Sequence, residues 1–161
     1  MSRMFTFITK PPWNPVGGEC RINCNYCWAK KLIKRYPTLQ KKYSGPAKLY
    51  HKELSKKFKA EDFIFVSDMR DLFEPNVPRD IIWQVLGNIA NSPAKFLLLT
   101  KNPERYLEFA LPKNVVAGAT IETDLGFGRM ERIIAMRKVR SPKMISIEPI
   151  MNFSNDFPYM I

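Results

Sequence analysis

The chain has 161 residues, of which 45% are hydrophobic and 12% aromatic, and its formal net charge at pH 7 is +11. This length and apolar content predict a single domain with one core over residues 1–161. The short apolar run at the N-terminus is interrupted by Lys10 and does not resemble a signal peptide, and no apolar run approaches the ~18 residues of a membrane span. These features argue against secreted and membrane classes, so we expect a cytoplasmic protein with no membrane partner.

The first predicted strand, residues 4–9 (MFTFIT), leads into a polar loop that holds every cysteine of the chain. Cys20, Cys24 and Cys27 lie within eight positions of one another, too close to link distant elements by disulfides. Their odd number also argues against a disulfide framework. The cysteines therefore indicate ligand or redox chemistry in a reducing compartment.

The next segment, residues 30–59, carries most of the positive charge. It contains 11 Lys or Arg residues and one acid, Glu53, which gives it a net charge of +10 and leaves +1 for the rest of the chain. Four aromatic residues are interspersed with these charges: Tyr36, Tyr43, Tyr50 and Phe58. Such a mixture suits phosphate contacts and base stacking, so one hypothesis is nucleic-acid binding through Lys30 to Lys59. A solvated charged face with the aromatics in the core, or another acidic partner, are the alternatives.

Beyond the basic segment, apolar runs alternate with helical patterns. The runs are nearly continuous, which is typical of strands covered on both faces; they are residues 62–67, 95–100, 114–121 and 143–148. The predicted helices are residues 28–36, 78–92, 102–110 and 126–138. This alternation predicts an α/β fold with a parallel sheet of about five strands, either open or curled towards a barrel.

The predicted strands share a feature at their carboxyl ends, where polar residues follow the apolar run. These are Thr9, Lys10, Ser67, Asp68, Thr100, Lys101, Glu122 and Glu148. In parallel α/β folds this edge carries the ligand site, because loops and helix N-termini converge there. Since the cysteines follow the first strand, we expect them at the same edge.

Three thiolates in a compact loop can face one centre, and thiolates suit iron-sulfur clusters or zinc. Structural zinc normally takes four protein ligands, but the single histidine, His51, lies 24 positions beyond Cys27. Three ligands would leave one metal corner open for a small molecule. Zinc, and ordinary cysteines buried in a turn, are the alternatives to a cluster.

The motif CRINCNYC resembles the Cys-x3-Cys-x-aromatic-Cys signature of the radical S-adenosylmethionine (radical SAM) superfamily. The chain also resembles a phage-associated radical-SAM-like family without an established substrate, in WNPVGGEC, VSDMRDLFEPNVP, FLLLTKNPERY, NVVAGATIE and ISIEPI. This resemblance implies a partial TIM-type (β/α) barrel. Radical SAM cores usually have one strand more than the five predicted, which suggests a truncated member or a fragment.

The resemblance also implies roles for the residues of the loop. Cys20, Cys24 and Cys27 would bind three irons of a 4Fe-4S cluster, and the fourth iron would take the amino and carboxylate groups of S-adenosylmethionine. Tyr26 would border the adenine. Reduction by an electron donor would cleave S-adenosylmethionine to a 5′-deoxyadenosyl radical, which abstracts a hydrogen atom from substrate.

Further cofactor contacts are expected at the strand ends. Many radical SAM proteins carry a GGE motif for the methionine amino group after the second strand, where this chain has Ser67 and Asp68. Glu122 would accept hydrogen bonds from the ribose, and Lys101 or Glu148 would face cofactor or substrate. Helix capping or a place on the surface rim are the alternatives for these side chains.

The function expected from this reading is a radical SAM enzyme of unknown substrate, with nucleic acid as one candidate. The alternative is a non-catalytic iron-sulfur or zinc module that binds nucleic acid.

Overall fold

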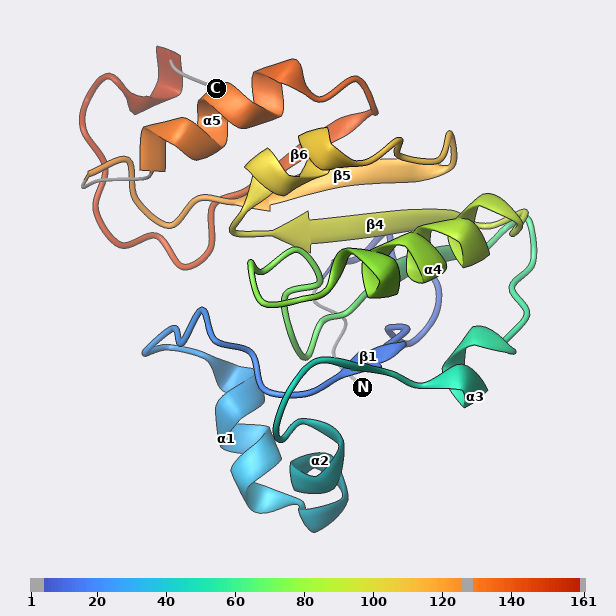
Figure 1. Cartoon of the computed structure of the whole chain (residues 1–161). Coiled ribbons are helices and arrows are strands. Elements are labelled where there is room, and N and C mark those ends of the chain that lie inside the picture. Colours follow the sequence, from blue (N-terminus) through green and yellow to red (C-terminus); the bar gives the residue numbers. More distant parts are fainter. Residues whose placement is uncertain (1–4, 126–128, 160–161) are drawn as a thin grey trace.

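The computed structural model describes residues 5–125 and 129–159 (Figure 1). Its main sheet has four parallel strands in the order β3-β4-β5-β6: β3 (Phe63–Val66), β4 (Lys95–Thr100), β5 (Val115–Thr120) and β6 (Lys143–Ser146). Each strand lies inside one of the four ranges predicted after the basic segment. The α/β class with a parallel sheet is confirmed.

Helices connect these strands, as the alternating pattern predicts: α4 (Arg79–Ala90), the 3-10 helix η1 (Pro103–Glu108) and α5 (Arg129–Lys138). Neighbouring strands taken in chain order with right-handed crossovers place their connecting helices on the same face of a sheet. Accordingly, Ile82 and Ile89 of α4 and Met136 of α5 pack into one core with Phe96 of β4 and Ala117 of β5. This core fixes the sheet against its helices.

The opposite face of the sheet is covered by the N-terminal segment, where Phe5 and Ile8 pack on Phe65 and Leu97. The predicted first strand is wrong for the described residues 5–9, which form a bend and a turn, while Met4 lies outside the described residues. The main sheet therefore has four strands rather than five in the described part of the chain.

The chain does run beside β3 a little later. The backbone N–H groups of Thr9 and Trp13 donate to the carbonyls of Phe63 and Phe65 at 3.0 and 2.9 Å. Residues 11 and 12 are both proline and carry no N–H, so a regular ladder cannot form between these two contacts.

The remaining elements precede and follow the main sheet. They are β1 (Val16–Gly17), α1 (Trp28–Arg35), α2 (Pro37–Lys42), β2 (Lys48–Leu49), α3 (His51–Leu54) and η2 (Phe157–Tyr159). β1 and β2 pair antiparallel, which joins the chain before the cysteines to the basic segment. No described helix combines the length and the apolar composition needed to cross a membrane.

Candidate metal and cofactor site

Residues 18–27, here called the cysteine loop, lie at the ends of the parallel strands towards which the arrows of β4 and β5 point in Figure 1. The thiol of Cys20 lies near the backbone N–H of Asp71, which follows β3 and acts to lower the pKa of that thiol. Tyr26 contacts Lys101, which follows β4. The structure thus brings the cysteines to the carboxyl edge of the sheet, together with polar residues predicted to lie there.

The three cysteines are free and each is partly exposed. Burial raises the pKa of the Cys20 thiol to about 11, although the backbone N–H groups of Asp71 and Ile22 act in the opposite direction. Within residues 5–125 and 129–159, no three His, Cys, Asp or Glu side chains are grouped so that they could hold a metal ion. The thiols share one loop without forming a preassembled ion site.

A buried ion pair, here called the clamp, fixes the start of the cysteine loop. Arg70 and Glu74 form it at 2.6 Å between Nη2 and Oε1, with side chains 0% and 1% exposed. Nη1 of Arg70 donates to the carbonyl of Gly17 at 2.6 Å. The second oxygen of Glu74 accepts from the backbone N–H of Arg21 at 2.7 Å. Because these contacts lie on both sides of Cys20, the clamp sets the position of that thiol.

Asp71 connects the segment after β3 to the end of β4. Its carboxylate accepts from the Thr100 hydroxyl at 2.7 Å and from the backbone N–H groups of Lys101 and Phe73, both at 2.8 Å. Burial raises the pKa of Asp71 despite these donors. The Asp71 side chain therefore connects the segment after β3 to the end of β4.

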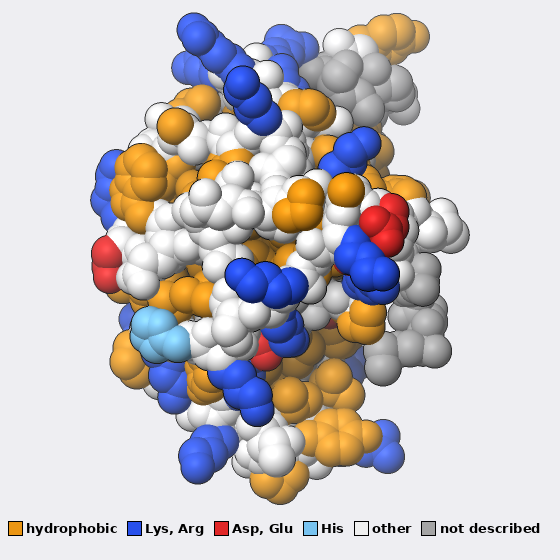
Figure 2. All heavy atoms as spheres, turned by 90° about the vertical axis from the view of Figure 1, so that its right-hand side faces the viewer, with side chains coloured by type: hydrophobic (Ala, Val, Ile, Leu, Met, Phe, Trp, Pro, Cys, Tyr) orange, Lys and Arg blue, Asp and Glu red, His pale blue; other side chains and the backbone are white. Residues whose placement is uncertain are grey.

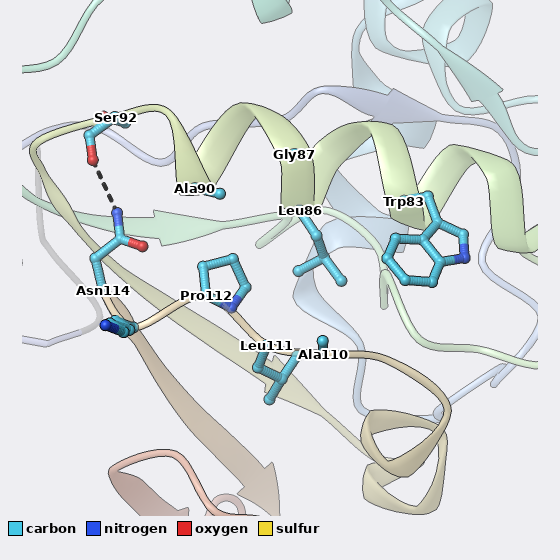
Figure 3. A pocket seen from close by; sticks show the side chains of 10 residues that line it. Trp83, Leu86, Gly87, Ala90, Ser92, Ala110, Leu111, Pro112 and Asn114 are labelled. Atoms are coloured by element: carbon cyan, nitrogen blue, oxygen red, sulfur yellow. Dashed lines mark hydrogen bonds between the residues drawn. The ribbon is translucent and has the colours of Figure 1, made fainter.

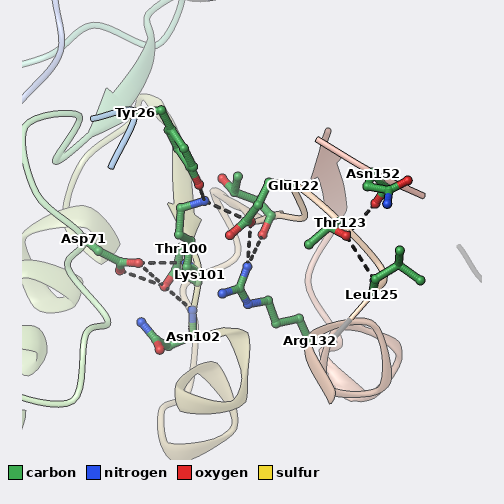
Figure 4. A network of polar contacts seen from close by, with 11 residues as sticks. Tyr26, Asp71, Thr100, Lys101, Asn102, Glu122, Thr123, Leu125, Arg132 and Asn152 are labelled. Carbon is green, nitrogen blue, oxygen red and sulfur yellow. Dashed lines mark hydrogen bonds and ion pairs between the residues drawn. The ribbon is translucent and has the colours of Figure 1, made fainter. Parts of the chain in front are cut away.

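A polar network extends from the cysteine loop across the strand ends (Figure 4). The Lys101 ammonium donates to the Tyr26 hydroxyl at 2.7 Å and to Glu122 Oε2 at 3.0 Å. Arg132 of α5 donates to the same Glu122 oxygen at 2.8 Å. Cys24 lies near the Tyr26 hydroxyl and contributes to the raised pKa of Tyr26. The network therefore joins the cysteine loop to the ends of β4 and β5.

The electrostatics of this network follow from its burial and its charges. Burial disfavours ionisation of Glu122, but the hydrogen bond and charge of Lys101, helped by Arg132, outweigh it and lower the pKa of Glu122. Burial, with the nearby Cys24 and Glu122, raises the pKa of Tyr26. At neutral pH the site thus presents an ionised carboxylate and a neutral phenol.

Two buried polar atoms in the described part of the chain lack a hydrogen-bond partner at this edge: Ser67 Oγ at the end of β3 and Asn102 Nδ2 just beyond β4. Ser67 also has a positive φ of 60°, which is uncommon for a residue other than glycine. Its neighbour Asp68 accepts from the Asn14 amide at 2.7 Å, and burial raises the pKa of Asp68. Buried polar atoms without partners are rare and call for a ligand or water.

The other sequence-predicted candidates lie outside this network. Glu148 is exposed beyond β6. In the basic segment, Tyr43 is buried and Phe58 packs against Trp13, whereas Tyr36 is 44% exposed. The core alternative therefore holds for Tyr43 and Phe58. The face of the molecule that carries α3 has scattered basic side chains and few acidic ones (Figure 2).

The structure also contains an apolar groove of about 610 Å³. Side chains of α4, including Trp83 and Leu86, line one side and residues 110–114 line the other (Figure 3). Residues 110–114 lead into the start of β5, at the end of the sheet opposite to the cysteine loop. The groove shares no residue with the polar network.

Sequence reasoning missed Arg70, Glu74 and Arg132, which hold the site together. Arg70 and Glu74 have the four-residue spacing of a helical ion pair, but they lie in the turns between β3 and α4. Spacing alone gives no sign that both charges are buried.

Residues 6–157 match a sequence family described as a protein of unknown function (DUF5131). The chain belongs to this family. The matched range includes the cysteine loop, the clamp and the whole polar network. Comparisons with curated proteins and with solved structures found no match.

Proposed function

We propose that the chain is a radical SAM iron-sulfur enzyme that acts on a substrate still to be identified. The observation that carries the proposal is the contact of Tyr26 with Lys101 at 2.7 Å, since it joins the cysteine motif to the carboxyl edge of a parallel sheet. Ligand sites of parallel α/β folds lie at that edge. Enzymatic use of the cysteines would place the protein in a reducing, cytoplasmic compartment with an electron donor.

We also infer that the sheet is part of a TIM-type barrel. Its four strands are parallel and follow chain order, and α4 and α5 pack on one face. A barrel requires this repeated arrangement, with the helices outside and the site at the carboxyl ends of the strands.

The residues present fit a 4Fe-4S cluster with bound S-adenosylmethionine. Cys20, Cys24 and Cys27 provide soft thiol ligands and would hold the cluster. Ser67 offers an unpartnered buried hydroxyl at the position expected for the methionine amino group. When bound and reduced, the cluster and S-adenosylmethionine supply a 5′-deoxyadenosyl radical for hydrogen abstraction.

The side chains around the loop would orient this cofactor. Glu122 is ionised at neutral pH and can accept hydrogen bonds from hydroxyl groups such as those of a ribose. Tyr26 presents an aromatic ring beside Cys24 for contact with the adenine. Asp68, held by Asn14, can accept a hydrogen bond from an amino group.

The test is anaerobic reconstitution with iron and sulfide, addition of S-adenosylmethionine and dithionite, and quantification of 5′-deoxyadenosine. Wild type should produce 5′-deoxyadenosine, and Cys24→Ala should not. Lys113→Ala changes an exposed side chain at the opposite end of the sheet and should behave as wild type. A stable cluster that leaves S-adenosylmethionine intact would contradict the proposal and favour the non-catalytic module.

A further inference from the structure

One face of α1 carries an exposed tryptophan and three exposed basic side chains. Trp28, Lys31, Lys34 and Arg35, here called the α1 stripe, are all exposed, and Trp28 retains 44% of its accessible surface. Their spacing of three, four and seven residues places them on one side of a helix. The opposite side is fixed inwards, since Ala29 packs with Tyr43 and Met69.

The positive charges of the stripe have no acidic counterpart in the described part of the chain. The one acid of residues 30–59, Glu53, pairs with Lys56 at 2.7 Å and with Lys42 at 4.0 Å. Lys59 pairs with Glu61 at 3.8 Å. The stripe therefore keeps its full charge towards solvent, which favours a polyanionic partner.

The stripe also starts at the cysteine loop. Trp28 directly follows Cys27, and Arg35 lies about 10 Å further along the helix. In Figure 1, α1 stands beside the loop and apart from the main sheet. A strand bound along this face would reach the candidate site.

We propose that the α1 stripe binds single-stranded nucleic acid and presents it to the cysteine loop. The three basic side chains would contact successive phosphates, and the Trp28 ring would stack on a base; this pairing of cations with an aromatic platform is how proteins hold single strands. Binding of the nucleic acid does not depend on the proposed radical chemistry, whereas a role of the nucleic acid as substrate rests on that proposed function.

The experiment measures binding of fluorescein-labelled single-stranded DNA and RNA of mixed sequence by anisotropy, with the full chain, before and after cluster reconstitution. Neutralising the stripe by the triple substitution Lys31→Gln, Lys34→Gln and Arg35→Gln should weaken binding about 100-fold in roughly 0.1 M salt. The reason is that each lost phosphate contact lowers the slope of log affinity against log salt concentration by about 0.7. The slope itself should fall by about two.

The matched control neutralises three exposed basic residues at the opposite end of the sheet: Lys113→Gln, Lys138→Gln and Arg140→Gln. It changes the net charge equally and should leave affinity within about threefold of wild type, since it removes no direct contact. Trp28→Ala should weaken binding by about 5- to 150-fold, the range of one base stack. Circular dichroism checks that each variant is folded.

Several results would overturn the proposal: no binding of single strands, an equal loss of affinity in both triple variants, or tighter binding of duplex than of single strands. Displacement of the oligonucleotide by polyglutamate to the same extent in wild type and in Trp28→Ala would also overturn it. The last result would indicate an acidic protein partner. Binding needs neither cluster nor S-adenosylmethionine, so failure of this proposal is distinguishable from failure of the radical SAM proposal. If the protein cleaves S-adenosylmethionine but does not bind nucleic acid, only the nucleic-acid proposal is overturned.

Discussion

Removal of the Glu74 carboxylate tests whether the clamp holds the cysteine loop. In Glu74→Ala the Arg70 guanidinium, 0% exposed, keeps its contact with the Gly17 carbonyl but loses its counter-charge. Breaking a buried ion pair by removing one partner costs about 3–5 kcal/mol, because the remaining charge stays buried without compensation. The backbone N–H of Arg21 also loses its acceptor, so we expect the upper part of this range.

The assay is urea denaturation at neutral pH, with Glu61→Ala as the control. Glu61 pairs with Lys59 at 3.8 Å, but those side chains are 70% and 75% exposed, so its loss should cost about 0–1 kcal/mol. If Glu74→Ala does not fold, Glu74→Gln keeps the shape and removes only the charge. Equal destabilisation in the buried and exposed pairs would refute this reasoning. The Cys20 thiol should also react faster with a thiol reagent in the folded Glu74 variants.

Three further predictions concern the site and its supports. The pKa of Glu122 is lowered in the folded protein, so the ionised carboxylate stabilises the fold at pH values above its ordinary pKa of 4.5, and this stabilisation is lost as the pH falls through the lower pKa of the folded state. The difference in free energy of unfolding between wild type and Glu122→Gln should therefore become smaller below pH 4.5, and a difference that grows there would contradict this assignment. Thr100→Val removes a donor to Asp71 and should cost about 1–3 kcal/mol in urea denaturation; a change within experimental error would show that this hydrogen bond is dispensable. Gly18 and Gly45 both have positive φ, at 91° and 70°, but a Cβ on Gly18 would lie 2.3 Å from a backbone oxygen, whereas a Cβ on Gly45 would have no atom within 4 Å. Gly18→Ala should therefore destabilise the protein clearly more than Gly45→Ala, for which ~1 kcal/mol is expected, and equal melting temperatures of the two variants would argue against the observed packing.

The sequence predicts the main sheet well because its strands are continuous apolar runs. The run 95–100 coincides with β4, and η1 begins at Pro103, as the preference of proline for the first helical position indicates, although the Asn102 side chain makes no capping hydrogen bond. The predicted first strand is wrong because residues 5–9 form a bend and a turn that pack Phe5 and Ile8 onto the face of the sheet. Pro11 and Pro12 then prevent a regular ladder beside β3, an effect that the apolar run before them does not reveal.

The candidate site is predictable in part for a similar reason. Lys101 and Glu122 meet because both follow parallel strands, which end at one edge, and Tyr26 reaches them from the loop. The roles of Arg70 and Glu74 depend on burial between segments far apart in the chain, which local spacing does not encode. The three cysteines stand out in the sequence from their spacing alone, whereas the binding of a metal by them stays a proposal.

The most direct measurement of the central claim is electron paramagnetic resonance of the reconstituted, dithionite-reduced protein with and without S-adenosylmethionine. A 4Fe-4S cluster held by three cysteines would have one iron without a protein ligand, so the account predicts that the signal of the reduced cluster shifts when S-adenosylmethionine is added. Glu122→Gln should require more S-adenosylmethionine for the same shift. A cluster signal that is identical with and without S-adenosylmethionine would contradict the open iron site and the function proposed from it.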